Sequence, residues 1–164
     1  MWIPLGIHIG SSLTRRYILK APKRPGLVTV TAYATLLSVP IHMATHRLLP
    51  SVSAPPISSL SPSEMNFEFV KAGLSVWPVF TWMGYASLVS VVLLHGAEGA
   101  SVVLRYFTGY APSKWLRRTI AAAVAFSVFF GLYRISQEPL HLRGAQLERV
   151  KAVYAMIPPY AYFL

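Results

Sequence analysis

The chain contains no cysteine and no aspartate, and all five of its acidic residues are glutamates. Without cysteine there is no disulfide, thiolate metal site or cysteine nucleophile. Charged residues make up only 12% of the 164 residues, whereas a soluble domain carries about 25%. Hydrophobic residues make up 54%. Such a chain cannot cover its apolar surface with polar groups, which indicates an integral membrane protein rather than a soluble enzyme.

The few charges are strongly unbalanced. Fifteen lysines and arginines against five glutamates give a net charge of +10. A basic protein can bind nucleic acid, but no basic helix interleaved with base-reading residues and no aromatic nucleic-acid signature is present. The basic residues instead flank apolar segments. We therefore expect the lipid bilayer as partner and no nucleic acid.

Three apolar segments are suited to cross a membrane. They cover residues 27–49, 76–96 and 119–133. The second segment can extend as far as Tyr106. A hydrocarbon layer of ~30 Å needs about 20 helical residues, although the third segment is shorter. The predicted fold is all-α, an integral membrane bundle of three transmembrane helices in residues 27–136.

The flanking regions have distinct compositions. Residues 1–26 form a basic arm with five lysines and arginines and no acid, a composition typical either of mitochondrial targeting or of an uncleaved basic arm beside the first span. Residues 50–64 hold four prolines and six serines and should form a loop. In the amphipathic and aromatic tail, residues 137–164, apolar residues recur at helical spacing. We expect a short amphipathic helix there, lying on the membrane surface; its apolar positions are Leu140, Leu147, Val150 and Tyr154.

Lysine and arginine counts favour one orientation. The arm and the second loop carry nine of them, and the first loop and the tail carry six. The positive-inside rule therefore places the N-terminus on the positive side. Small residues allow helices to approach closely in lipid, and an i, i+4 row of them on the third span predicts a packing face: Ala123, Ser127 and Gly131.

Ionisable groups within spans are costly, commonly by a few kcal/mol, and are therefore functional candidates. His42 and His46 lie one helical turn apart on the first span. Glu98 on the second span could be neutralised by His95 or by Arg105. No Ser-His-Asp arrangement, P-loop, dinucleotide fingerprint or carboxylate pair is present, so we expect no enzymatic activity.

His95 and Gly99 form a sharper feature, because a glycine one turn from a histidine leaves room for a flat ligand. The stretch is similar to the His-x-x-x-Gly of succinate dehydrogenase membrane anchors, although the Ile-Arg-His that follows there is absent. Such histidines hold haem iron in membrane cytochromes. His42 lies about 15 residues, roughly 22 Å, from the start of its span. His95 lies near that starting side, which argues against one haem between them.

We therefore expect no cofactor, with haem b on His95, His42 or His46 as the alternative. Without a cofactor, we expect His95 to form a hydrogen bond with a backbone carbonyl or to pair with Glu98.

The order of motifs resembles a known family. The first span ends in His-x-x-x-His-Arg-x-x-Pro, a Ser/Pro loop follows, and the second span carries His-x-x-x-Gly. A short third span and a tail with Val-Tyr near a proline complete the pattern. This resembles the transmembrane domain of the fungal Mcp-type mitochondrial outer-membrane adaptor family, from about Gly26 onward.

The resemblance implies a non-enzymatic, multi-span protein of a mitochondrial membrane, the outer one, that supports lipid homeostasis or organelle contact-site recruitment. Its implied partner is a lipid-transfer protein, recruited through a proline-containing peptide, and Pro22 and Pro25 lie in the arm. Two alternatives stay open: a haem-b or quinone-associated anchor, and an accessory subunit of a respiratory assembly.

Overall fold

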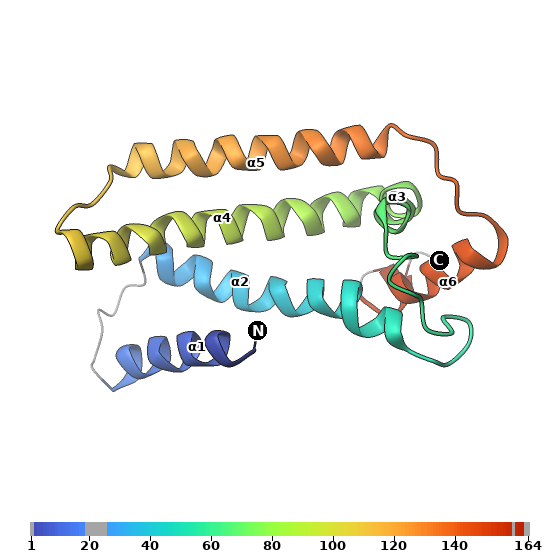
Figure 1. Cartoon of the computed structure of the whole chain (residues 1–164), viewed down its shortest axis with the longest axis horizontal. Helices are drawn as coiled ribbons and strands as arrows, with labels where there is room; N and C mark the ends of the chain where they lie inside the picture. Colours follow the sequence, from blue (N-terminus) through green and yellow to red (C-terminus); the bar gives the residue numbers. More distant parts are fainter. Residues whose placement is uncertain (1, 19–25, 159, 163–164) are drawn as a thin grey trace.

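The computed structural model describes residues 2–18, 26–158 and 160–162. Three long helices run side by side along the molecule: α2 (Leu27–Met43), α4 (Pro78–Thr108) and α5 (Lys114–Ser136) (Figure 1). Helix α1 (Trp2–Tyr17) lies beside the first half of α2. No strand occurs in the described ranges, which confirms the all-α prediction.

The long helices match the three predicted spans. Helix α2 continues through a π-helical segment, η1 (Ala44–Leu48), and a 3-10 turn, η2 (Leu49–Ser51). The resulting helices, Leu27–Ser51, Pro78–Thr108 and Lys114–Ser136, are all long and apolar enough to cross a membrane. Only 6% of the most apolar window of each is buried inside the protein. So much exposed apolar surface is consistent with a multi-pass membrane protein whose helices face lipid.

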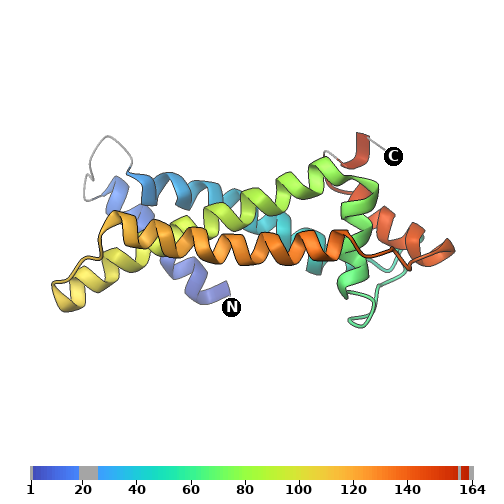
Figure 2. The same cartoon turned by 90° about the horizontal axis from the view of Figure 1, so that it is seen from above.

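The second span begins at a proline. The apolar residues before it belong to a separate helix, α3 (Phe67–Val76), which crosses the ends of the long helices instead of extending α4 (Figure 2). The break falls at Trp77, because the residue before a proline is disfavoured in the helical region. Pro78 then occupies the first turn of α4, where its missing N–H costs nothing. The helix continues to Thr108, which confirms the predicted extension.

One end of the bundle carries a compact layer that we call the cap. It consists of the loop 52–66, α3, the connection 137–143, α6 (Gly144–Ala155) and η3 (Tyr160–Tyr162). The ring of Phe69 stacks on that of Tyr154, with 4.9 Å between centroids, and Trp77 packs on the same tyrosine. The buried core of the cap comprises Ile57, Leu60, Phe69, Ala72, Trp77, Val150, Val153 and Tyr154.

The structure corrects the prediction for the C-terminal helix. Helix α6 is amphipathic, as expected, and it buries Val150, Val153 and Tyr154. Those side chains pack on α3 and on the loop 52–66, so the apolar face is already covered by protein. The helix therefore belongs to the cap core and does not use this face to lie on a membrane surface.

Ion pairs tie the cap together across long sequence separations. Glu68 pairs with Lys71 and accepts a hydrogen bond from the backbone N–H of His141 at 2.8 Å. Burial opposes ionisation of Glu68, yet the hydrogen bonds from Lys71 and His141 outweigh it and lower the pKa of this carboxyl to about 2. Arg149 pairs with Glu64 at 2.6 Å and donates to the Ile57 carbonyl at 2.8 Å. The charges of the cap are thus largely neutralised inside it.

Candidate functional site

The two histidines of α2 lie at the point where its α-helical geometry ends. The His42 and His46 rings are 4.5 Å apart between centroids. The π-helical turn η1 begins between them, and the hydroxyl of Thr45 donates to the Ile41 carbonyl at 2.9 Å. Single π-turns in helices occur frequently at functional sites because they redirect side chains. Here the π-turn lies beside the cap.

A tyrosine from α4 completes this polar group. The hydroxyl of Tyr85 lies 3.2 Å from Nε2 of His46, within hydrogen-bond distance. The opposite side of the His46 ring meets Phe69 of α3 edge-on, with 5.2 Å between centroids. Side chains from α2, α3 and α4 therefore meet at one place. Sequence reasoning missed Tyr85, because nothing in the apolar run around it marks it as the partner of a histidine 39 residues earlier.

These residues border a cleft between α2, α4 and the C-terminal segment. Its volume is about 350 Å³, at the lower end of the range for small-molecule sites. Most of its surface is apolar, and His42, His46, Tyr85 and Tyr160 contribute hydrogen-bonding groups. Leu37, Ile41, Met83 and Leu88 line its apolar part. A mostly apolar cleft with a few convergent polar groups is the usual form of a binding site.

The cap supplies neutral hydroxyls to the same cleft. Burial raises the pKa of Tyr160, and burial raises the pKa of Tyr154 still more, so both phenols stay protonated at physiological pH. The Tyr154 hydroxyl donates to the Phe69 carbonyl at 3.2 Å. A methyl group at Gly73 would lie only 2.7 Å from this hydroxyl, which explains the need for glycine there. The sequence pattern placed Tyr154 on the apolar face of α6 without indicating this contact.

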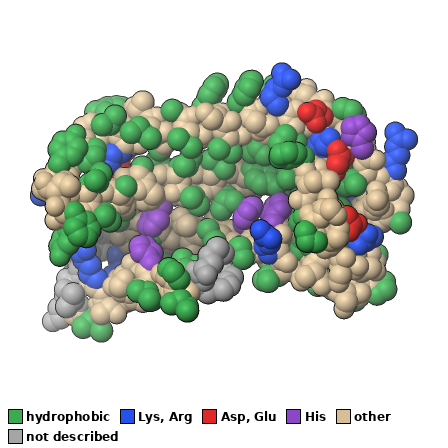
Figure 3. Space-filling model, viewed as in Figure 1, with side chains coloured by type: hydrophobic (Ala, Val, Ile, Leu, Met, Phe, Trp, Pro, Cys, Tyr) green, Lys and Arg blue, Asp and Glu red, His purple; other side chains and the backbone are tan. Residues whose placement is uncertain are grey.

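His95 lies elsewhere. Its Nδ1 is 3.2 Å from the carbonyl oxygen of Val28, at the start of α2, which confirms the expectation that it bonds a backbone carbonyl. The ring of His8, which sequence reasoning also missed, approaches it from α1 with 6.0 Å between centroids. In Figure 3 the histidine pairs form separate patches along the bundle. A Cβ built on Gly99 would meet nothing within 4 Å, so the predicted open space is present.

This arrangement bears on the haem alternative. Val28 precedes His42 by 14 residues, which is about 21 Å along a helix. His95, bonded to Val28, and His42 therefore lie at different depths and cannot hold one iron from opposite sides. In the described part of the chain no three histidine, aspartate or glutamate side chains gather into a metal-binding group.

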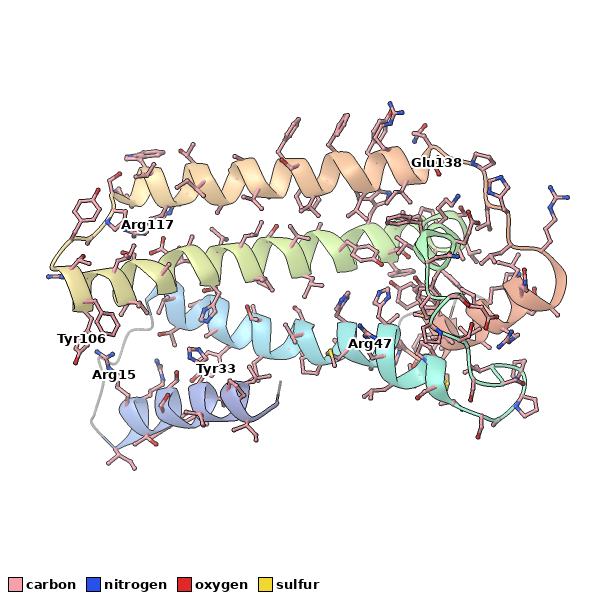
Figure 4. The ribbon with its side chains drawn as sticks, in the orientation of Figure 1. Arg15, Tyr33, Arg47, Tyr106, Arg117 and Glu138 are labelled. Atoms are coloured by element: carbon pink, nitrogen blue, oxygen red, sulfur yellow. The ribbon has the colours of Figure 1, made fainter. Side chains whose placement is uncertain are left out.

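Two further predictions need correction. Glu98 pairs neither with His95 nor with Arg105 but with Arg117 of α5, at 2.8 Å, because α5 folds back alongside α4. Arg118 lies near the same carboxylate, at 3.7 Å. The glutamate thus joins two spans near the α4–α5 turn, the end at which Figure 4 labels Arg117.

The predicted packing row on α5 is also wrong within the chain. Ala123 and Ser127 are exposed, and a Cβ added at Gly131 would meet no neighbour within 4 Å. Helix α5 instead buries Ala121 and Leu132. The three small residues therefore do not lie on the buried face of α5, because the rotation of this helix turns other residues toward its neighbours.

Comparison with protein families, with curated proteins and with solved structures found no match. The resemblance to the Mcp-type adaptors therefore stays a prediction. Pro22 and Pro25, which that resemblance singled out, lie outside the described residues.

Proposed function

We propose that this chain is a non-enzymatic, multi-span protein of a mitochondrial membrane, the outer one, and that it supports lipid homeostasis or organelle contact-site recruitment. The observation that carries the proposal is the cleft between α2 and α4. It opens among residues of two candidate spans and is mostly apolar, which suits a membrane lipid. The motif order supports the outer membrane as its location.

The lining of the cleft also supports a binding role over catalysis. Ser38 uses its hydroxyl to donate to the Ala34 carbonyl at 2.9 Å. In the described residues no hydrogen bond joins a serine or threonine hydroxyl to a histidine ring, so no activated nucleophile is formed there. Covalent catalysis by a serine or threonine has no starting arrangement in this cleft.

Cell fractionation tests the location. A tagged full-length chain should co-fractionate with mitochondrial outer-membrane markers and should be reached by protease added to intact mitochondria. Expression in cells that lack an endoplasmic reticulum–mitochondria tether should restore their mitochondrial lipid composition, and a lipid-transfer protein should co-precipitate with the chain. Recovery in the endoplasmic reticulum or the plasma membrane would refute this proposal.

A second candidate is a quinone-associated or haem-b anchor. The His46–Tyr85 pair favours it, since the hydrogen bond within the pair uses one of its two protons and leaves the other able to donate to a quinone carbonyl. An optical spectrum of the protein purified in detergent tests for bound haem, because haem gives a Soret band and, when reduced, an α-band. The lipid proposal expects neither band.

A further inference from the structure

The cleft opens sideways, toward the region where a bilayer would surround the spans. Leu37 and Ile41 of α2 and Met83 of α4 line it, and all three side chains are largely exposed. These residues belong to candidate spans, so in a bilayer that the spans cross their exposed sides would face hydrocarbon. A hydrophobic ligand could therefore enter from the bilayer without passing through water.

The polar side of the cleft has hydrogen-bonding capacity that the protein leaves unused. The ring nitrogens of His42 make no hydrogen bond to any described residue, although the side chain is half buried and lines the cleft. The Tyr85 hydroxyl lies within hydrogen-bond distance of His46 and also interacts with the Tyr154 hydroxyl, so it borders this space as a polar group that the protein already holds in place. An oxygen atom of a ligand placed here would find a donor in His42 and a second polar neighbour in Tyr85.

The lining carries no formal charge. Among the described lining residues there is no lysine, arginine, aspartate or glutamate. Arg47 follows His46 in the sequence, but it is exposed and does not line the cleft. A phosphate or carboxylate head group within the cleft would lose its hydration without gaining an opposite charge, which is unfavourable. A neutral head group with a hydroxyl or carbonyl oxygen has no such cost.

Resting on the proposed lipid function, we infer that this cleft binds one uncharged lipid, with a hydroxyl or carbonyl oxygen of its head group beside His42 and Tyr85. Its apolar part lies along Leu37 and Leu88. The volume of about 350 Å³ holds one small ring system or part of one acyl chain.

Photolabelling in vesicles tests the selectivity. The full chain is reconstituted in phosphatidylcholine vesicles that contain a photoreactive cholesterol, diacylglycerol or phosphatidylserine, and labelled peptides are mapped. The two uncharged probes should label peptides around Leu37 or Met83, whereas phosphatidylserine should not. Equal labelling by phosphatidylserine overturns the inference and leaves the lipid-binding proposal standing. Absence of labelling by all three probes overturns both.

A matched pair of glycine variants localises the binding. A Cβ on Gly84 would lie 3.8 Å from the Tyr160 hydroxyl, an ordinary contact, and Gly84 lines the cleft, so the rest of the leucine side chain in Gly84→Leu should occupy the cleft. Gly131→Leu adds the same side chain to open surface on α5. Labelling should fall to background in Gly84→Leu and stay unchanged in Gly131→Leu. Equal labelling of the two variants overturns the assignment to this cleft.

A conservative substitution tests the polar contact. Tyr85→Phe removes one hydroxyl and keeps the ring, and it should weaken labelling by the uncharged probes roughly two- to tenfold. Tyr133→Phe, on the exposed side of α5, is the control. Arg47→Gln should also leave labelling unchanged. A loss of labelling in Arg47→Gln, with Tyr85→Phe unaffected, would show that a charge recognises the ligand and would overturn the inference.

Discussion

The two ends of the bundle are built in different ways. The cap has a buried aromatic core around Tyr154, and most of its charges are paired, as in Arg149–Glu64. The opposite end, which we call the turn end, comprises residues 102–118 and the last turn of α1. It carries exposed aromatic side chains, and in Figure 4 the labelled Arg15 and Tyr106 both lie there. The exposed aromatic residues are Tyr17, Tyr106, Phe107, Tyr110 and Trp115.

The two ends also differ in how many of their charges are paired. At the turn end Glu98 neutralises Arg117 and lies near Arg118. No described acidic side chain lies within ion-pair distance of Arg15, Arg105 or Lys114. Arg16 contacts a ring, that of Tyr33, at 5.9 Å from its centroid. Unpaired cations and exposed aromatic rings suit the membrane–water interface, where head groups supply their partners. The cap is stabilised by its own contacts, whereas the turn end leaves cations without acidic partners among the described residues and leaves aromatic rings exposed.

The largest expected effect comes from removing the centre of the cap. Tyr154→Ala deletes the ring that stacks on Phe69 and contacts Trp77, and it leaves a cavity. We expect a loss of about 3–5 kcal/mol in the free energy of unfolding of the cap. Denaturant titration followed by tryptophan fluorescence measures it. Tyr133→Ala, exposed on α5, should change little. Similar losses in both variants would contradict the view that the cap has a core of its own.

The next effect concerns the response of the cap to acid. The pKa of Glu68, about 2 in the folded cap, lies below its ordinary value of 4.5, so the unfolded chain binds the proton more readily. Ionised Glu68 stabilises the folded cap fully above about pH 4.5, and this contribution is lost as the pH falls toward 2. Between about pH 5 and pH 3, Glu68→Gln should therefore lose less stability than the unchanged chain.

The control for this experiment is Glu148→Gln. It removes a more exposed ion pair, Glu148–Lys151 at 2.9 Å, within one helix. Thermal unfolding in detergent is measured at each pH. The stability of the Glu148→Gln variant should fall with decreasing pH as steeply as that of the unchanged chain. A Glu68→Gln variant with the same slope would mean that the acid sensitivity of the cap arises elsewhere.

The smallest effect tests the dependence of the turn end on lipid. Lys114→Gln should weaken retention of phosphatidylserine by the purified protein by at most about fivefold, since one interfacial cation contributes about 1 kcal/mol. The substitution also removes a cation from the N-terminus of α5, where it is unfavourable, so folding should not suffer. Native mass spectrometry at low salt measures the retained lipid.

Arg143→Gln removes a cation from the cap and serves as the matched control. Arg143 is exposed and precedes the first residue of α6. We expect this variant to retain phosphatidylserine as the unchanged chain does. An equal loss in both variants would remove the distinction between the two ends.

Much of the fold could be predicted because it depends on local features. The apolar segments marked the three spans, and the proline- and serine-rich stretch marked the loop before α3. A backbone carbonyl was one of the two partners expected for His95, the other being Glu98, since an imidazole in a span needs a hydrogen-bond partner. Contacts between distant helices could not be predicted. Glu98 has Arg117 as its partner only because of the way α5 folds back along α4.

The amino-acid sequence by itself determined how many helices are long and apolar enough to cross a membrane, because the thickness of hydrocarbon and the rise of an α-helix set the length of an apolar run. It also determined that His42 and His46 share one face, because they are one turn apart. Only the tertiary structure decided that Tyr85 joins them and that the tail forms a cap, leaving a cleft beside them. Those outcomes depend on how helices far apart in the chain rotate and pack against one another. The shapes of the contacting side chains control this packing, and the periodicity of apolar residues does not reveal it.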